Sequence, residues 1–374
     1  MKSPLKVLQL GKFYHPSFGG IETVLKNISE GLVKTGNQVT VLCSSQNSKG
    51  GDEWINGVRV IRAPCFGSAF SQPICPSLAL KLIRILPEFD VVQIHTPHPF
   101  TEGITSLLPE RIPLVASYHS DVIRQKLLLP FYKPLLMKFL RRADRIVVAT
   151  PNHIQHSPYL SMPDVQPKCR VIPYGLDPAR FVASTTPQNQ FGAYVLFVGR
   201  LVSYKGVHTL IEAIRQTPFQ LVIVGEGPCQ SELEALAKTL RIEDRVHFMG
   251  KVESEVKMAS LFSDCRIFVL PSITRAEAFG VVQLEAMAYG KPVIVSRLDS
   301  GVTLVNQDGV TGLHVEPRNS HDLAQAITRL MTDEPLRAKL GEAARTRFLE
   351  EYTFEKMVQR YSDLFFELHR YSVK

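Results

Sequence analysis

Residues 270–290 read Leu270-Pro-Ser-Ile-Thr-Arg-Ala-Glu-Ala-Phe-Gly-Val-Val-Gln-Leu-Glu-Ala-Met-Ala-Tyr-Gly290, in the order strand, loop and helix. Gly280 precedes the helix, where a residue without a Cβ lets another group approach the backbone closely. Glu277 lies in the loop, and Glu285 lies about one to two turns into the helix. The segment therefore predicts a helix N-terminus flanked by two carboxylates at the end of a strand.

Short runs of branched apolar residues recur on both sides of this segment and alternate with helical patterns. In the first half they fall at 5–10, 39–42, 58–61, 91–95, 114–118, 146–149 and 170–172. In the second half they fall at 194–198, 221–224, 246–248, 267–270, 293–295 and 312–315. Continuous apolar strands separated by helices are typical of a parallel sheet covered on both faces. We therefore predict an α/β protein with two Rossmann-like, doubly wound domains.

The polar stretch 177–192 separates the two arrays and contains Pro178, Pro187 and Gly192, so it is the expected linker. The expected domains are residues 1–180 and 193–353, and a last helical pattern at 354–374 is expected to pack back on the first domain. Ligands of open parallel sheets bind outside the carboxyl ends of the strands, so two such domains facing across a cleft would share one deep site.

Composition narrows the class of protein. A net charge of +8 and a pI near 9.1 favour anionic partners, but no nucleic-acid motif is present, so phosphorylated ligands or an acidic membrane surface are expected. No apolar run approaches the roughly 18–20 residues that span a bilayer, and the start of the sequence has no signal-peptide pattern. We therefore expect a cytoplasmic protein. The six scattered cysteines have no zinc-ligand spacing and indicate inert thiols.

A second loop, at 198–206, follows the first strand of the second array and carries Arg200 and Lys205. These cations can neutralise a diphosphate and the charge that develops on a leaving group. The chain has no Asp-x-Asp pair, so we expect no metal or other cofactor and assign this work to the two cations. Alternatively, both are ordinary exposed loop charges.

Other strand ends carry further candidates. Free N–H groups at the start of the 281–290 helix suit a diphosphate, while Glu277 and Glu285 can accept hydrogen bonds from sugar or ribose hydroxyls. Alternatively, Glu277 only complements the helix dipole and Glu285 is solvated. Gly19 and Gly20 open a helix and offer N–H groups, unless they form only a tight turn. His119, with Asp121 two residues away, ends the 114–118 strand and is either a ligand or a structural histidine.

The E-x7-E spacing of Glu277 and Glu285, together with Gly199-Arg200…Lys205-Gly206 and Gly19-Gly20, resembles the retaining glycosyltransferases of family four, which have the GT-B fold. The resemblance covers essentially the whole chain. It implies a front-face transfer in which the leaving phosphate helps to deprotonate the incoming hydroxyl, so that no protein base is needed. The implied roles are diphosphate binding by Arg200 and Lys205, ribose binding by Glu285, donor-sugar binding by Glu277, backbone N–H donation by Phe279, Gly280 and Gly20, and a place beside the donor sugar for His119.

The segment His119-Ser-Asp-Val-Ile-Arg-Gln-Lys126 is similar to family members that are mannosyl- or rhamnosyltransferases of surface-polysaccharide assembly. This similarity makes Asp121 and Arg124 expected substrate-binding residues. The implied function is metal-independent transfer of a hexose, first of all mannose from GDP-mannose, to a glycan or lipid-linked acceptor. The alternatives are a UDP-sugar-dependent transferase, a sugar-nucleotide epimerase, a phosphorylase, or a non-catalytic sugar-nucleotide-binding module. Intact Arg200, Lys205, Glu277 and Glu285 argue against the last.

The basic, apolar stretch 127–142 follows this segment. It combines leucines and Phe131 with basic residues, and another basic residue stands just before it. The basic residues are Lys126, Lys133, Lys138, Arg141 and Arg142. Such a stretch can lie on an anionic membrane and meet a lipid-linked acceptor, which predicts a peripheral location at the inner face of the cytoplasmic membrane. Alternatively, it is a core helix with a solvated basic edge.

Overall fold

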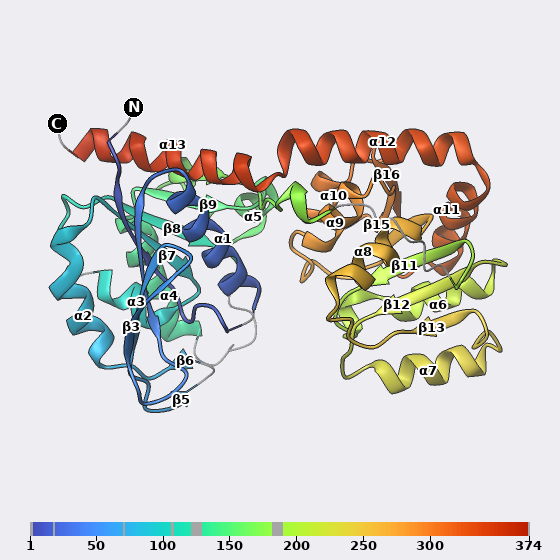
Figure 1. Ribbon diagram of the computed structural model, residues 1–374, viewed down its shortest axis with the longest axis horizontal. Helices are drawn as coiled ribbons and strands as arrows, with labels where there is room; N and C mark the ends of the chain where they lie inside the picture. The colour runs from blue at the N-terminus through green and yellow to red at the C-terminus, as the bar shows by residue number, and fades with distance from the viewer. Residues whose placement is uncertain are drawn as a thin grey trace. The chain divides into compact units, whose positions relative to one another are not determined.

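The computed structural model describes residues 3–17, 19–69, 72–105, 108–120, 129–181 and 190–372. The chain divides into two compact units (Figure 1): unit 1 is Met1–Tyr174 with Phe354–Lys374, and unit 2 is Gly175–Thr353. The division lies earlier than the polar stretch at 177–192. Residues 175–181 belong to unit 2 because Leu176 N donates to Tyr352 O at 2.9 Å and Phe181 packs edge-on against Phe348, with ring centroids 5.9 Å apart.

Unit 1 is built on an eight-stranded sheet of order β10-β9-β8-β7-β1-β2-β4-β3, parallel except for the β3–β4 pair. Its strands are β1 (Lys6–Leu10), β2 (Gln38–Ser44), β3 (Gly51–Ile55), β4 (Val58–Ala63), β7 (Val91–Thr96), β8 (Leu114–Tyr118), β9 (Arg145–Val148) and β10 (Cys169–Val171); β5 (Ser68–Ala69) and β6 (Gln72–Pro73) form a separate hairpin. The parallel, doubly wound sheet confirms the prediction, and β3 was not predicted.

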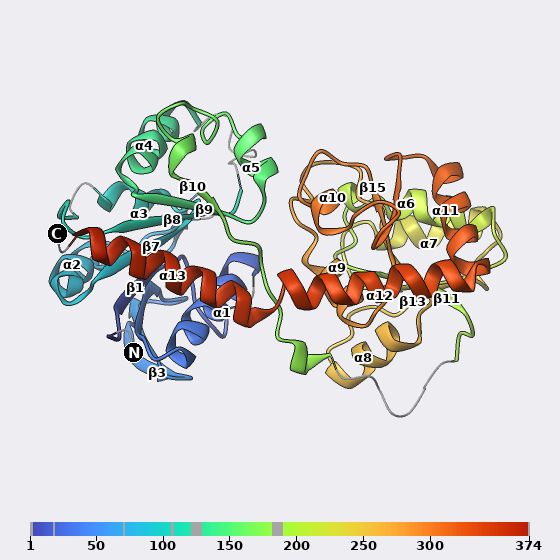
Figure 2. The same ribbon diagram turned by 90° about the horizontal axis from the view of Figure 1, so that it is seen from above.

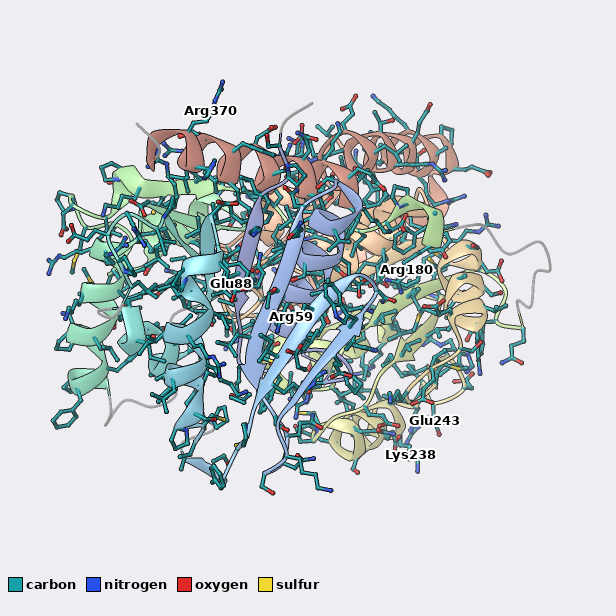
Figure 3. All side chains as sticks on the ribbon, turned by 60° about the vertical axis from the view of Figure 1, so that its left-hand side comes forward. Arg59, Glu88, Arg180, Lys238, Glu243 and Arg370 are labelled. Atoms are coloured by element: carbon teal, nitrogen blue, oxygen red, sulfur yellow. The ribbon has the colours of Figure 1, made fainter. Side chains whose placement is uncertain are left out.

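The edge strand β3 is polar and exposed, which explains why an apolar pattern did not reveal it. It is held to β4 by cross-strand ion pairs as well as backbone bonds. Arg59 on β4, labelled in Figure 3, pairs with Asp52 at 2.7 Å, and Arg62 pairs with Glu53 at 2.7 Å. Charged side chains on an edge strand also discourage pairing with other chains.

Helices cover both faces of the unit 1 sheet. They are α1 (Gly20–Lys34), α2 (Ser77–Ile85), α3 (Pro99–Ile104), α4 (Leu129–Arg142), α5 (Pro151–His156) and α13 (Phe354–Ser372). Side chains alternate along each strand, so Leu8 and Leu10 pack under α2, α3 and α4, whereas Val7 packs under α1 and α13. Figures 1 and 2 show α13 lying beside α1, where Tyr361 and Phe365 enter the core.

Unit 2 contains a six-stranded, wholly parallel sheet of order β13-β12-β11-β14-β15-β16. The strands are β11 (Tyr194–Val198), β12 (Gln220–Val224), β13 (Val246–Phe248), β14 (Ile267–Leu270), β15 (Val293–Ser296) and β16 (Gly312–Val315). The helices are α6 (Val207–Arg215), α7 (Gln230–Thr239), α8 (Glu255–Asp264), α9 (Val281–Ala288), α10 (Val302–Val305), α11 (Ser320–Thr332) and α12 (Glu334–Glu351). All six predicted strands of this half are present.

Strand order reverses once in each sheet, between β1 and β7 in unit 1 and between β11 and β14 in unit 2. At such a reversal the loops that follow the two central strands diverge to opposite faces and leave a crevice for ligands. Each unit therefore has one favoured binding position.

In the described part of the chain, no helix is long and apolar enough to cross a membrane.

Candidate active site

The reversal in unit 2 brings together two loops that are far apart in the sequence. The loop after β11 turns through a 3₁₀ helix at Ser203–Lys205, and the loop after β14 leads to Glu277 and α9. Gly206 has φ +69°, and a Cβ there would overlap with the carbonyl oxygen of Pro271. Ile273 N also donates to Tyr204 O at 2.8 Å. Only glycine permits this approach, which places Lys205 beside Glu277.

Lys205 and Glu277 form an ion pair between Nζ and Oε2, and the same Oε2 accepts a hydrogen bond from Ser272 Oγ at 2.9 Å. The side chains of Lys205 and Glu277 are only 11% and 9% exposed. A pair so well shielded from water depends on both partners, because loss of either leaves an uncompensated charge. The family resemblance had implied that Lys205 binds the diphosphate and Glu277 binds the donor sugar. The sequence suggested no role for Ser272.

Arg200 lies in the same loop but in a different environment. Its side chain is exposed, and it forms no ion pair with the residues that the structure describes. Since Glu277 balances the charge of Lys205, the set of Lys205, Glu277 and Arg200 carries one net positive charge, that of Arg200. This arrangement suits a ligand that carries phosphate.

Helix α9 begins beside this group with free backbone donors. Gly280 is its N-cap in the left-handed conformation, with φ +69°, and no side chain of the described residues caps the helix. A Cβ at Gly280 would lie 2.6 Å from Leu270 Cδ2, so the glycine also permits close packing against β14. Phe279 is buried beneath the turn and meets Tyr352 edge-on. Uncapped N–H groups and the positive end of the helix dipole favour an anion here.

Glu285 lies further along α9. Burial raises the pKa of its carboxyl to about 7, against a smaller lowering by Arg180. Arg180, labelled in Figure 3, lies in the 3₁₀ helix Pro178–Arg180 and pairs with Glu255 of α8 at 3.3 Å. No hydrogen bond to the Glu285 carboxyl comes from the described residues. Among the described residues both carboxyl oxygens therefore lack a donor and can meet a ligand, and near pH 7 the carboxyl can donate as well as accept.

Unit 1 places the other candidates near its own reversal. Gly19 is the extended N-cap of α1, no side chain in the described part of the chain caps it, and both Gly19 and Gly20 are exposed. The N-terminus of α1 is therefore exposed at these two glycines, and N–H donation to a ligand from them stays a prediction. Asp121 and Arg124 lie outside the described residues.

His119 follows β8 and is hydrogen-bonded through both ring nitrogens. Its Nε2 lies 2.9 Å from His95 Nδ1, and its Nδ1 lies 3.0 Å from the hydroxyl of Tyr174. Burial, with a further contribution from His153, lowers the pKa of His119 to about 3. The imidazole is therefore neutral at physiological pH. His95 on β7 is its direct partner.

Known proteins match both halves of the chain. Residues 18–180 match the family model "Glycosyltransferase Family 4", and residues 185–347 match "Glycosyl transferases group 1". The chain is 32% identical to the O-antigen chain mannosyltransferase C of Escherichia coli, over 96% of this chain and 98% of that protein. It is 37% identical to the D-rhamnosyltransferase WbpZ of Pseudomonas aeruginosa, over 93% of this chain and 92% of that protein.

Solved structures agree on the architecture. The sucrose-phosphate synthase of Thermosynechococcus elongatus has a TM-score of 0.77 at 22% identity, covering 97% of this chain and 99% of that one. The fold and the matches define a glycosyltransferase of GT-B fold that transfers a hexose. The chain belongs to glycosyltransferase family 4.

Proposed function

We propose that the enzyme transfers mannose from GDP-mannose, with retention of anomeric configuration and without a metal ion, to a glycan or lipid-linked acceptor. The observation that carries this proposal is the shielded Lys205–Glu277 pair beside exposed Arg200, where the strand order of unit 2 reverses. Cations, a carboxylate and an uncapped helix N-terminus are the complementary groups for the diphosphate and the sugar of one donor molecule.

The donor diphosphate binds Arg200, Lys205 and the N-terminus of α9. As the bond to the sugar breaks, negative charge collects on the diphosphate, and cations fixed in advance stabilise that charge. Glu277 uses Oε2 for Lys205 and Ser272, and no described residue donates to its Oε1. This oxygen accepts from sugar hydroxyls. Glu285, with both oxygens available, accepts from the hydroxyls of the ribose.

Retention follows a front-face route in which the leaving phosphate accepts the proton of the incoming hydroxyl. Neutral His119 then contributes a hydrogen bond, and no protein side chain transfers a proton. NMR of the anomeric centre tests this route. We expect the product to keep the α-configuration of the donor, whereas an inverted product would refute it.

The choice of donor rests on the relatives. One is named a mannosyltransferase and the other a D-rhamnosyltransferase, and D-rhamnose is 6-deoxymannose, so both sugars share one ring configuration. A thermal-shift screen of GDP-mannose, UDP-glucose, UDP-N-acetylglucosamine and ADP-glucose tests the choice. A ligand at 100 times its Kd stabilises the fold by about 2.7 kcal/mol. GDP-mannose should raise Tm most, and a larger shift with a UDP-sugar would favour the UDP-dependent alternative.

The second part of the proposal is that the enzyme contacts the inner face of the cytoplasmic membrane. Such a contact would bring it to a lipid-linked acceptor. The apolar face of α4 is occupied by the core, because Leu136, Phe139 and Leu140 are buried. The contact therefore rests on the exposed edge of α4, where Phe131 is 82% exposed and Lys133 lies nearby. Co-sedimentation with anionic vesicles should weaken with salt and fall in Phe131→Ser. Absent or salt-insensitive binding would argue against it.

A further inference from the structure

The interior of unit 1 contains a continuous chain of polar side chains that ends at His119. Gln9 Nε2 donates to Gln93 Oε1 at 2.7 Å, and Gln93 Nε2 donates to Ser117 Oγ. Gln9 Oε1 lies 3.0 Å from His95 Nε2. These strand residues are buried, on adjacent strands β1, β7 and β8. Buried polar groups are expensive unless each is satisfied, so such a chain has one preferred arrangement.

The direction of each hydrogen bond follows from the first. Because Gln9 presents its carbonyl oxygen to His95, His95 Nε2 carries the proton. Neutral His95 then has an unprotonated Nδ1, which accepts from His119 Nε2–H. Neutral His119 in turn has an unprotonated Nδ1, which accepts from the hydroxyl of Tyr174. The two glutamine amides therefore determine the tautomer of a residue two links away.

We infer that His95 is a positioning residue for the transfer reaction: held by Gln9, it fixes His119 with Nε2 protonated and presents His119 Nδ1 as an acceptor for a hydroxyl group. The inference rests on the proposed function, which places His119 beside the donor sugar. In the free enzyme the hydroxyl is that of Tyr174, the last residue of unit 1 before unit 2 begins. In the donor complex a sugar hydroxyl takes the place of the Tyr174 hydroxyl, which is the same chemical group.

The chain of polar side chains also reaches α13. Tyr361 is buried on that helix, and its hydroxyl interacts with Ser117 and Gln93. The chain of polar side chains is therefore anchored on a helix that follows unit 2 in the sequence.

The test compares His95→Leu, His95→Asn and His119→Ala, with Tyr194→Phe as a matched control. Tyr194 is buried at the first position of β11, and the loop that carries Arg200 and Lys205 follows the other end of that strand. The Tyr194 hydroxyl donates to Leu261 O at 2.7 Å. Two quantities are measured: the histidine ¹⁵N shifts of the intact enzyme, and the kcat and KM for GDP release from GDP-mannose. Wild-type enzyme should show His119 protonated at Nε2.

In His95→Leu we expect mixed His119 tautomers and a kcat reduced about ten-fold or more. A misplaced His119 would stabilise the transition state less. His95→Asn keeps an oxygen that can accept from His119 and should recover part of the rate, and Tyr194→Phe should change neither readout. Wild-type kcat and tautomer in His95→Leu, or a proton found on His119 Nδ1, would overturn the inference. A fully active His119→Ala would instead refute the proposed place of His119.

Discussion

Removing either partner of the Lys205–Glu277 pair should damage stability as well as activity. The two side chains are 11% and 9% exposed, so each single substitution to alanine leaves a charge that water cannot solvate. The cost of breaking such a pair is about 3–5 kcal/mol. For a unit the size of unit 2, each kcal/mol lowers Tm by roughly 2–4 °C, so the expected fall is on the order of 10 °C.

The double variant Lys205→Ala/Glu277→Ala separates the pair from its surroundings. It leaves no unpaired charge, so its Tm should lie above the value obtained by adding the two single losses. Lys251→Ala is the matched control, because Lys251 and Glu253 are 2.6 Å apart but 66% and 76% exposed. That variant should cost less than about 1 kcal/mol.

Activity provides the second readout of the same variants. Both single variants should lose about 100-fold or more in kcat for GDP release, as expected when a fixed group that stabilises transition-state charge is removed. The double variant should stay inactive although its stability recovers. Strictly additive Tm losses would refute the reasoning about the pair, and unchanged kcat in both single variants would refute its placement at the donor.

Three further predictions concern separate features. Burial raises the pKa of Glu102 on α3 from 4.5 to about 7. Its neutral form therefore favours the folded state, and that stability should be lost as pH rises from about 4.5 through 7. Denaturation midpoints of Glu102→Gln should lack this decline. Gly206→Ala should lower Tm because it combines φ +69° with overlap onto Pro271, whereas Gly20→Ala, which meets no atom within 4 Å, should be mild. Transfer activity should survive EDTA, and a complete loss reversed by magnesium would contradict the proposed metal independence.

The parallel sheets were predictable because buried parallel strands are apolar along their whole length. All thirteen predicted strands appear in the two sheets. Strand β3 was not predicted, because ion pairs rather than apolar side chains hold it to β4. The loops that carry the candidate residues were also predictable, since the carboxyl ends of parallel strands attract ligands.

Partners within the site were less accessible to sequence reasoning. Lys205 and Glu277 are 72 residues apart, and nothing in either loop indicates that they form an ion pair. His95 follows Ile94 on β7, whose residues are all buried, and it resembles an ordinary core residue until its contact with His119 is seen. The glycosyltransferase family is established by the matches, whereas the roles of individual residues in transfer remain predictions.

The position of α13 has a consequence for synthesis of the chain. Its apolar side chains complete one of the two cores of unit 1, although the ribosome makes them only after all of unit 2. Until then, the face of the sheet beneath α13 lacks its cover. Unit 2 is contiguous and contains all of its own helices, so we expect it to reach its native structure before the half that emerged first. During that interval the nascent first half presents an apolar surface that chaperones recognise.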